Sequence, residues 1–469
     1  MTEPRLAIHW FRQDLRLQDN TALLHALKNN LTVIPVYIMD CADADEWPRG
    51  AASKWWLHKS LTELNKSLNE KLVILNGSAE DILPDLIKKT GATTALWNRC
   101  YEPWRISRDK KIKLLLSNAG ITVKTFKDSV LWEPWEVLKS DNTPYKIFTP
   151  YYNNGCLKSP LQPGTPDNTK VPHSLFDDKS TLGNDISSLN LVPKIKWYKD
   201  FESEWTPGES GAKKALSTFL KKNLPHYKEG RDIPSNRSTS RLSPHLHFGE
   251  ISIRSVWHEA RKTGIEERQE HNMEHFCREI GWREFSTSLL YHFPDIPKNP
   301  LQKKFTAFPW DKNPTALKAW QKGETGIPII DAGMRELWKT GYMHNRVRMI
   351  AASFLVKNLL IHWHEGEKWF WDCLLDADLA NNSASWQWVA GCGTDAAPYF
   401  RIFNPVTQGE KFDPNGTYVR THVPELKNIP NRHIHRPWDS PNPPTNYPSP
   451  IIDIASSRER ALEAFAQIK

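Results

Sequence analysis

The chain has 469 residues, of which 39% are hydrophobic and 25% are charged, and its formal net charge at neutral pH is +8. This length exceeds what one hydrophobic core normally serves, so we predict two or three domains of a soluble globular protein. No run of about eighteen apolar residues occurs, and the first residues lack a cationic segment followed by an apolar one. We therefore expect no membrane span, no secretory signal and a cytoplasmic location.

Cysteine and histidine usage favours neither disulfides nor a metal site. The six cysteines are scattered and form no C-x-x-C pair, so they are expected to be free thiols. Three short His-x-His pairs, at positions 245 and 247, 362 and 364, and 433 and 435, lack a partnering cysteine or acidic pattern. No metal is expected.

Charge and aromatic content favour a polyanionic partner. The isoelectric point is about 9.0, which suits nucleic acid but also occurs in proteins that do not bind it. Of the 21 tryptophans, eleven lie at or beyond Trp257. Indole rings serve base stacking and electron transfer, and they are costly as mere core filling because each N–H needs a partner.

Short β-branched segments alternate with amphipathic ones in the first 130 residues. The expected strands are residues 6–11, 32–38, 72–75, 94–97 and 122–126, and the expected helices include 52–68, 79–89 and 103–118. This alternation predicts a doubly wound, Rossmann-like α/β domain with a five-stranded parallel sheet. No G-x-G-x-x-G follows the first strand. Trp10, Arg12, Asp14 and Arg16 stand at that strand's carboxyl end, where a ligand contact and a salt-bridged strand exit are equally good interpretations.

Residues 131–200 are rich in Pro, Gly, Asn, Asp and Ser and show little periodicity, which predicts an interdomain linker on the surface. Apolar spacing near 3.6 residues then continues through residues 201–469 and predicts an all-α domain. The expected helices are residues 212–222, 251–262, 270–290, 316–322, 328–339, 345–361, 365–376 and 456–467.

The stretch DADLANNSASWQWVAGCGTDAAPYFRIFNP, residues 376–405, combines acids, amides and tryptophans. Asp376 and Asp378 are two apart, so they cannot share a helix face and are better interpreted as a helix-entry pair. The amides and small side chains of residues 381–385 would let a flat ligand approach the backbone. Taken alone, the stretch suits a capped helix with two core tryptophans as well as a cofactor site.

Two further clusters carry chemistry. Residues 238–243 set four hydroxyls around Arg241, which offers donors and a cation for a diphosphate, although a plain polar turn is the simpler interpretation. On an expected helix, Glu279 shares a face with Trp282 and Arg283, which would suit a flipped base. The alternative is a surface ion pair between Glu279 and Arg283.

Several of these segments resemble the photolyase/cryptochrome family of flavoproteins. Besides residues 376–405, the matching motifs are IHWFRQDLRLQDN (8–20), TSRLSPHLHFGEIS (239–252), EIGWREF (279–285) and GYMHNRVRMIAASFLVKNLLIHW (341–363). The likeness runs over nearly the whole chain, in order, and is greatest to microbial class I cyclobutane pyrimidine dimer photolyases. It implies an α/β antenna domain (1–130), a linker (131–200) and an all-helical FAD-binding catalytic domain (201–469).

The resemblance implies a binding site for FAD, which is reduced and anionic when active. The cofactor-binding residues that it implies are Tyr227, Thr239, Ser240, Arg241, Leu242, Ser243, Asn345, Asp376, Ala377, Asp378 and Asn382. Asn382 is expected beside flavin N5, where a neutral amide can reorient its hydrogen bond. Trp310, Trp363 and Trp386 match the family's electron-relay tryptophans.

UV-damaged DNA is the implied partner of what we expect to be a monomer. The implied contacts to DNA or the lesion are Arg231, Glu279, Trp282, Arg283, Asn345, Arg346, Met349, Trp388 and Gln408, with Glu279 also catalytic. Relatives that repair 6-4 photoproducts carry histidines at the positions of Asn345 and Met349. Amide and thioether cannot shuttle protons, so the implied reaction is light-dependent cyclobutane splitting by electron transfer.

Two questions stay open. The antenna pocket has Trp104-Arg105 where the folate-binding branch has Asn-Glu, which favours a deazaflavin or FMN over methenyltetrahydrofolate, or no antenna at all. A cryptochrome-type blue-light photoreceptor with the same cofactor is the alternative function, and a repair enzyme restricted to single-stranded DNA is a third.

Overall fold

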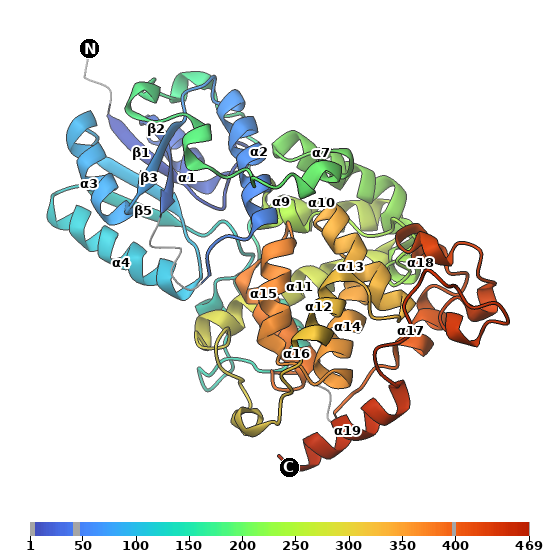
Figure 1. Cartoon of the computed structure of the whole chain (residues 1–469). Coiled ribbons are helices and arrows are strands. Elements are labelled where there is room, and N and C mark those ends of the chain that lie inside the picture. The colour runs from blue at the N-terminus through green and yellow to red at the C-terminus, as the bar shows by residue number, and fades with distance from the viewer. Residues whose placement is uncertain (1–4, 41–46, 396–399, 469) are drawn as a thin grey trace.

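The computed structural model describes residues 5–40, 47–395 and 400–468. The first part of the chain is built on a parallel sheet. Its strands are β1 (Leu6–Phe11), β2 (Thr32–Asp40), β3 (Val73–Gly77), β4 (Thr94–Asn98) and β5 (Thr122–Phe126), in the order β3-β2-β1-β4-β5. All neighbouring pairs are parallel, as predicted. Figure 1 shows this sheet and its helices at one end of the molecule.

Helices cover both faces of the sheet. Alternate residues of β1 enter different cores: Ala7 and Phe11 pack with α1 (Thr21–Lys28) and α2 (Ala51–Ser67). Ile8 and Trp10 pack with α3 (Ala79–Thr90) and α4 (Pro103–Asn118). Because side chains alternate along a strand, burying both sets requires two helical layers, which is the predicted doubly wound arrangement.

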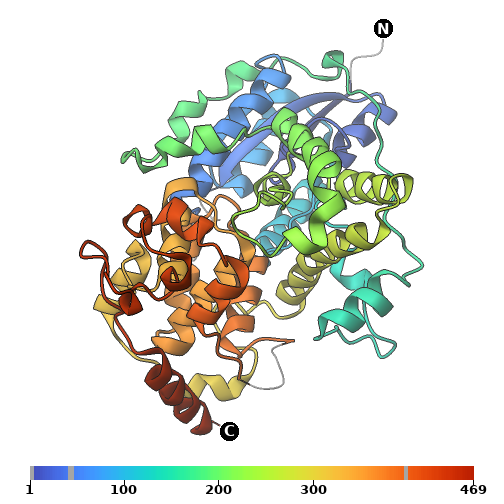
Figure 2. The same ribbon diagram turned by 90° about the vertical axis from the view of Figure 1, so that its right-hand side faces the viewer.

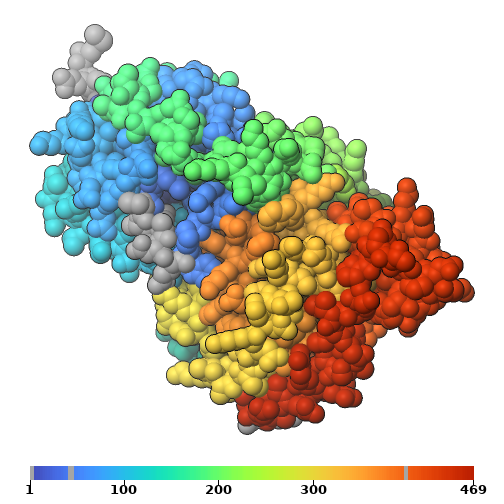
Figure 3. All heavy atoms as spheres, in the orientation of Figure 1, coloured from blue at the N-terminus to red at the C-terminus, as the bar shows by residue number. Residues whose placement is uncertain are grey.

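The predicted surface linker, residues 131–200, also contributes side chains to the cores of both halves. It contains 3-10 and π turns but no helix longer than a few residues. Phe148, Tyr151 and Tyr152 enter a core of the helical half, whereas Val171 and Phe176 enter the core beneath β2. Figure 3 shows this green segment lying across the blue end of the molecule towards the helices.

The second half is helical, as predicted (Figures 1 and 2). Its helices are α6 (Phe201–Glu204), α7 (Glu209–Thr218), α8 (Tyr227–Gly230), α9 (Ser243–His247), α10 (Ile253–Glu266), α11 (Glu270–His292), α12 (Pro314–Lys322), α13 (Pro328–Thr340), α14 (Asn345–Ser353), α15 (Trp363–Cys373), α16 (Leu379–Ala390), α17 (Pro405–Phe412), α18 (Thr417–His422) and α19 (Ile454–Ala466). No helix of the described chain is long and apolar enough to cross a membrane.

One predicted helix, residues 345–361, is wrong in its length. The α-helix stops at Ser353, and a π turn follows over Phe354–Asn358. Leu360 then adopts a φ of 54°, and its carbonyl accepts a 2.8 Å hydrogen bond from the Asp311 amide. The apolar residues keep their helical spacing beyond Ser353 because this segment stays buried. Its backbone nevertheless leaves the α-helix, and Leu360 pairs with Asp311.

An ion pair and a buried hydrogen bond join the two halves. Arg16 binds Asp128 at 2.6 Å and also donates to the Gly249 carbonyl at 3.0 Å. Arg254, on α10, binds Asp19 at 2.8 Å. Phe248, Tyr342 and Leu375 of the helical half also complete the hydrophobic core under the sheet. The helical half is therefore fixed against the carboxyl ends of the strands.

Candidate functional site

The entry of α16 is capped as expected for the pair of aspartates. Asp378 is the N-cap, and its Oδ1 accepts hydrogen bonds from the backbone and side-chain nitrogens of Asn381 at 2.9 and 2.7 Å. Burial alone would raise the pKa of Asp378, but His247 and Arg283 lower it well below its usual range. The carboxylate is therefore charged at the start of the helix that carries Asn382, Trp386 and Trp388.

Asp376 forms an ion pair with Arg348 that the sequence analysis did not select. Arg348 Nη2 lies 2.9 Å from Asp376 Oδ2, and its Nε donates to the Met343 carbonyl at 2.7 Å. Burial would lower the pKa of Arg348, but Asp376 and Tyr342 raise it, so the guanidinium stays charged. Arg348 sits in the quoted MHNRVRM motif, three residues after Asn345, and that position was the available signal.

Buried polar atoms that make no hydrogen bond fit a bound polar cofactor. Asp376 Oδ1 and Arg241 Nη2 are buried and make no hydrogen bond within the described chain, although Arg241 Nη2 lies 3.5 Å from Glu204 Oε2. Unsatisfied buried groups are costly, so such atoms indicate a ligand or water. An acceptor and a guanidinium donor are what the hydroxyls and the diphosphate of FAD require, and the site therefore fits this cofactor.

The hydroxyl-rich turn lies beside these groups. Arg241 has a φ of 54°, and its guanidinium stands 4.0 Å from the Trp205 ring centroid and 5.1 Å from that of Tyr342. Thr239 lowers the pKa of the Tyr342 hydroxyl against the effect of burial, which places the two side chains together, and Ser243 opens α9. Leu242 is buried in the core, so only its backbone is left to meet a ligand.

The other implied cofactor residues differ in exposure. Tyr227 packs edge-on against Phe219 and Phe276, with both ring centroids 5.5 Å away. Ala377 and Asn382 are buried, and Asn382 Nδ2 donates to the Glu367 carbonyl at 3.0 Å. Asn345, the first residue of α14, is exposed. The structure thus brings Asp376, Ala377, Asp378 and Asn382 to one helix entry.

A charged cluster joins four of the residues expected to contact DNA. Arg231 forms an ion pair with Glu279. Arg346 binds Asp232 at 2.8 Å, and its Nη1 lies 3.9 Å from Met349 Sδ. Asp232 was missed by the sequence analysis, although it directly follows Arg231 in the chain.

Trp282 and Arg283, which were expected to share one face of α11 with Glu279, contact different parts of the protein. Trp282 stacks on Phe148 of the linker, with ring centroids 3.8 Å apart and planes at 11°. Arg283 donates instead to the Ser129 carbonyl at 2.8 Å and to Glu284 at 3.2 Å. The alternative Glu279–Arg283 ion pair is therefore not formed, because Ser129 and Glu284 hold Arg283 Nη1 and Glu279 binds Arg231. A phosphate contact by Arg283 stays a prediction.

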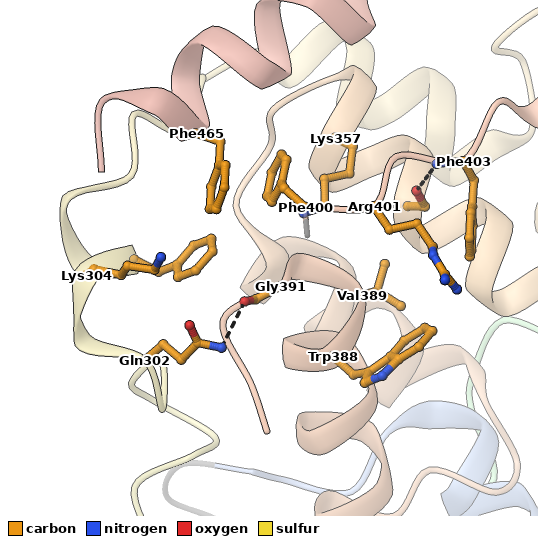
Figure 4. Close-up of a pocket in the computed structure, with 12 residues that line it drawn as sticks. Gln302, Lys304, Lys357, Trp388, Val389, Gly391, Phe400, Arg401, Phe403 and Phe465 are labelled. Carbon is orange, nitrogen blue, oxygen red and sulfur yellow. Dashed lines mark hydrogen bonds between the residues drawn. The ribbon is translucent and has the colours of Figure 1, made fainter. Parts of the chain in front are cut away.

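Trp388 lines a pocket at the far end of α16 (Figure 4). Its indole nitrogen donates to the Asp395 carbonyl at 3.0 Å. Lys304, Lys357 and Arg401 also line this pocket, and Phe400 and Phe465 stack face to face with centroids 4.4 Å apart. Glu279 and Trp282 are not among the lining residues. Gln408, on α17, is half-buried.

The three expected relay tryptophans belong to one hydrophobic cluster. Trp386 and Trp363 are buried, and Trp310 packs on the cluster's edge. His362 lies between two of them, with ring centroids 5.1 Å from Trp310 and 5.5 Å from Trp363. Trp386 also has Trp320 at 6.3 Å, an indole that the sequence analysis did not single out.

A second pocket lies at the carboxyl end of β1, between the two halves. Its lining includes Trp10, Arg12, Trp47, Trp104, Arg105, His247 and Trp371. Both interpretations of the strand exit apply to Arg12: it binds Asp109 at 2.5 Å and it also faces this pocket. Asp14 and Arg16, by contrast, are held in buried hydrogen bonds and ion pairs.

No group of three or more histidine, cysteine or acidic side chains within the described residues could hold a metal ion. The geometry fits a polar cofactor beside a cluster of paired charges, and comparison with known proteins defines the class. Residues 7–169 match the DNA photolyase family, and residues 276–467 match the FAD binding domain of DNA photolyase. The chain belongs to the photolyase/cryptochrome family.

Individual relatives cover nearly the whole chain. A deoxyribodipyrimidine photo-lyase of Agrobacterium fabrum is 47% identical over 98% of both chains. Cryptochrome-1 of Arabidopsis thaliana is 36% identical over 98% of this chain and 70% of its own length. The crystal structure of a class III photolyase from Agrobacterium tumefaciens superposes with a TM-score of 0.94 at 45% identity, covering 100% of this chain and 98% of that one.

The expected likeness to class I is therefore wrong, because the strong match is to a class III enzyme. The motifs on which the class I expectation rested are those expected to surround the cofactor and the lesion. Relatives named photo-lyase and cryptochrome both match this chain over nearly its full length, so motifs of this kind identify the family and do not separate its classes.

Proposed function

We propose that the protein repairs cyclobutane pyrimidine dimers in UV-damaged DNA under blue light. When bound, reduced FAD supplies the excited electron for this reaction. The observation that carries the proposal is the cluster of Arg231, Asp232, Glu279, Arg346 and Met349, in which two cations and two carboxylates stand beside a thioether. It offers contacts to phosphates and to a base edge, without the histidines that 6-4 photoproduct repair requires.

The absence of a suitable acid or base at Asn345 and Met349 favours cyclobutane dimers over 6-4 photoproducts. The neighbouring His344 does not replace one, because its ring accepts the Arg346 backbone hydrogen bond at 3.2 Å as the N-cap of α14. Burial lowers the pKa of His344 to about 4, so the ring is neutral near pH 7. A reaction that needs an imidazolium is therefore not supported.

The remaining residues have separable roles in this proposal. Arg231 and Arg346 meet phosphates of the flanking strand, and the net positive charge adds long-range attraction. Glu279 accepts a hydrogen bond from the dimer and stabilises it when the electron arrives. Trp282 and Trp388 offer ring faces to a base turned out of the stack.

The test uses purified holoprotein, reduced and illuminated, with oligonucleotides that carry one defined lesion. We expect loss of the cyclobutane dimer in duplex and single-stranded substrates in the light, no loss in the dark, and no repair of a 6-4 photoproduct. Repair of the 6-4 substrate would overturn the assignment of lesion type. Repair of single strands alone would support the third interpretation of the sequence.

A photoreceptor role is the second candidate, because the chain is 36% identical to a plant cryptochrome over 98% of its length. The same assay separates the two functions. A pure receptor would bind FAD and respond to light without lowering the dimer content of any substrate.

The pocket between the two halves is proposed to hold an antenna chromophore. Its tryptophans offer ring faces, and Arg12 and Arg105 suit an acidic tail. A deazaflavin or FMN, favoured from the sequence, combines a flat ring with such a tail, and so does methenyltetrahydrofolate. Absorption spectra of the holoprotein and mass spectrometry of its released chromophores decide between them, and finding FAD alone would contradict the proposal.

Replacing Trp386 with phenylalanine is expected to slow light-driven reduction of oxidised FAD strongly, because a phenyl ring is much harder to oxidise than an indole. Chemically reduced protein should still repair dimers at the wild-type rate. The matched control is Trp257→Phe, since Trp257 is also buried but packs against Trp132 in a different cluster. Equal photoreduction by Trp386→Phe and wild type would remove Trp386 from the relay.

A further inference from the structure

A wholly buried carboxylic acid lies directly behind Asn382. Glu367, on α15, is 0% exposed. Its Oε1 accepts a 2.6 Å hydrogen bond from Ser383 Oγ, and its backbone carbonyl accepts the 3.0 Å bond from Asn382 Nδ2. Adjacent residues of α16 are thus tied to the side chain and the backbone of one residue of α15.

The two helices pack closely beside this contact, and the Glu367 side chain is shielded from solvent. A methyl group added at Gly366 would come within 2.1 Å of the Trp386 ring, so the indole packs flat against the α15 backbone. Burial raises the pKa of Glu367 to about 8, although the Ser383 hydrogen bond and Lys368 oppose the shift. Glu367 is therefore neutral near pH 7.

A second titratable group near Glu367 is also neutral near pH 7. Cys392 follows α16 and lies near Glu367. Burial raises the pKa of the Cys392 thiol to about 12, and Glu367 adds to this shift, whereas Lys357 opposes it. Lys368, on α15 itself, is exposed. The titratable groups near Glu367 are thus the Cys392 thiol, with Lys357 beside it, and the exposed Lys368.

The hydrogen bonds fix the orientation of the Asn382 amide. Its nitrogen is used by the Glu367 carbonyl, so its Oδ1 is left to accept a bond from elsewhere. Because Glu367 Oε1 accepts from Ser383, the acid proton resides on Oε2. That atom is buried and has no hydrogen-bond partner within the described chain.

We propose that Glu367 is a positioning residue: its backbone carbonyl holds the Asn382 nitrogen and so turns the Asn382 carbonyl towards the flavin, while its neutral side chain, bound to Ser383, keeps the region behind Asn382 uncharged. This inference rests on the proposed function, in which Asn382 lies beside flavin N5. Ionisation of Glu367 would place a negative charge behind the amide, and the reduced, negatively charged cofactor would become less stable. The carboxylic acid therefore favours the reduced form that repair needs.

The test measures the midpoint potential of bound FAD against pH in wild type and in Glu367→Gln, which keeps the shape and cannot ionise. Above about pH 8, the potential of the wild type should fall more steeply with pH than that of Glu367→Gln. The control is Asp331→Asn on α13, another fully buried acid, which is bound by Thr325 and Tyr447 away from α16. It should follow the wild-type curve, and identical curves for wild type and Glu367→Gln would overturn the inference.

A second readout needs no cofactor. The pKa of Glu367 rises from an ordinary 4.5 to about 8 on folding, so its stabilising contribution is full below pH 4.5 and is lost as the pH rises to about 8. Thermal unfolding of the apoprotein should therefore show Glu367→Gln gaining on wild type across this range. A constant difference between them would show that Glu367 is ionised in the fold and would contradict the proposal.

Ser383→Ala serves if the glutamine variant folds poorly. Removing the hydrogen bond to Oε1 disfavours the ionised form further, so the alkaline break in the potential should move to higher pH. An unmoved break would also contradict the proposal. Protein that binds no FAD would refute the proposed function itself, whereas protein that binds FAD and repairs dimers but shows no effect at Glu367 would refute only this inference.

Discussion

Replacing Arg348 with alanine is expected to leave the helical domain unable to retain FAD. The substitution removes the partner of Asp376, whose side chain is only 6% exposed and whose second oxygen is already unpaired. Breaking such a buried pair costs about 3 kcal/mol, and a loss of that size in binding raises the Kd by about 100-fold. The measurement is FAD content after gel filtration, with the Kd from titration of apoprotein.

The double variant Arg348→Ala, Asp376→Ala distinguishes a binding role from a structural one. Removing both charges leaves no isolated buried carboxylate, so thermal stability should recover most of its loss. FAD affinity should stay low because both contacts are gone. If the double variant regained FAD along with stability, the ion pair would support the fold and would not contact the cofactor.

Replacing Glu279 with alanine is expected to lower the repair yield per absorbed photon by about 10-fold, since a hydrogen bond between a charged group and its partner is worth about 1.5–3 kcal/mol. DNA affinity should stay the same or increase, because a negative charge is removed from a surface that faces phosphates. The yield is measured with dimer-containing duplex at saturating protein, and the affinity by fluorescence anisotropy.

Arg231→Ala is the matched variant, because Arg231 is the other half of the same ion pair. Its loss should weaken binding of all DNA and reduce the salt dependence by about one phosphate contact. Once the complex is saturated, its repair yield should match wild type. Equal loss of yield and affinity in Glu279→Ala would mean that Glu279 only orients Arg231.

Local patterns were sufficient for much of the architecture. The alternation of β-branched and amphipathic segments predicted all five strands within three residues at their ends, and the Asp376–Asp378 spacing predicted a capped helix entry. The prediction failed at Leu360, where a tertiary contact to Asp311 overrides a periodicity that only reports burial.

The sequence predicted which types of residue form the candidate site, but it predicted only some of the contacts between them. Glu279 and Arg283 have ideal spacing for an ion pair on a helix, yet Glu279 binds Arg231 and Arg283 binds the backbone carbonyl of Ser129. These partners are 48 and 154 positions away in the sequence, so no local rule could find them. Glu367 and Arg348 were missed for the same reason, because their importance comes from neighbours on other elements.

The central claim is that the helical half holds reduced FAD close enough to a bound dimer to pass it an electron and take it back. The most direct measurement is the fluorescence lifetime of reduced FAD in the holoprotein, with dimer-containing and with undamaged DNA. We predict a shorter lifetime only with the dimer, with FAD still reduced after each pair of pyrimidines is restored. Equal lifetimes with both DNAs, or one FAD oxidised for every dimer lost, would contradict this account.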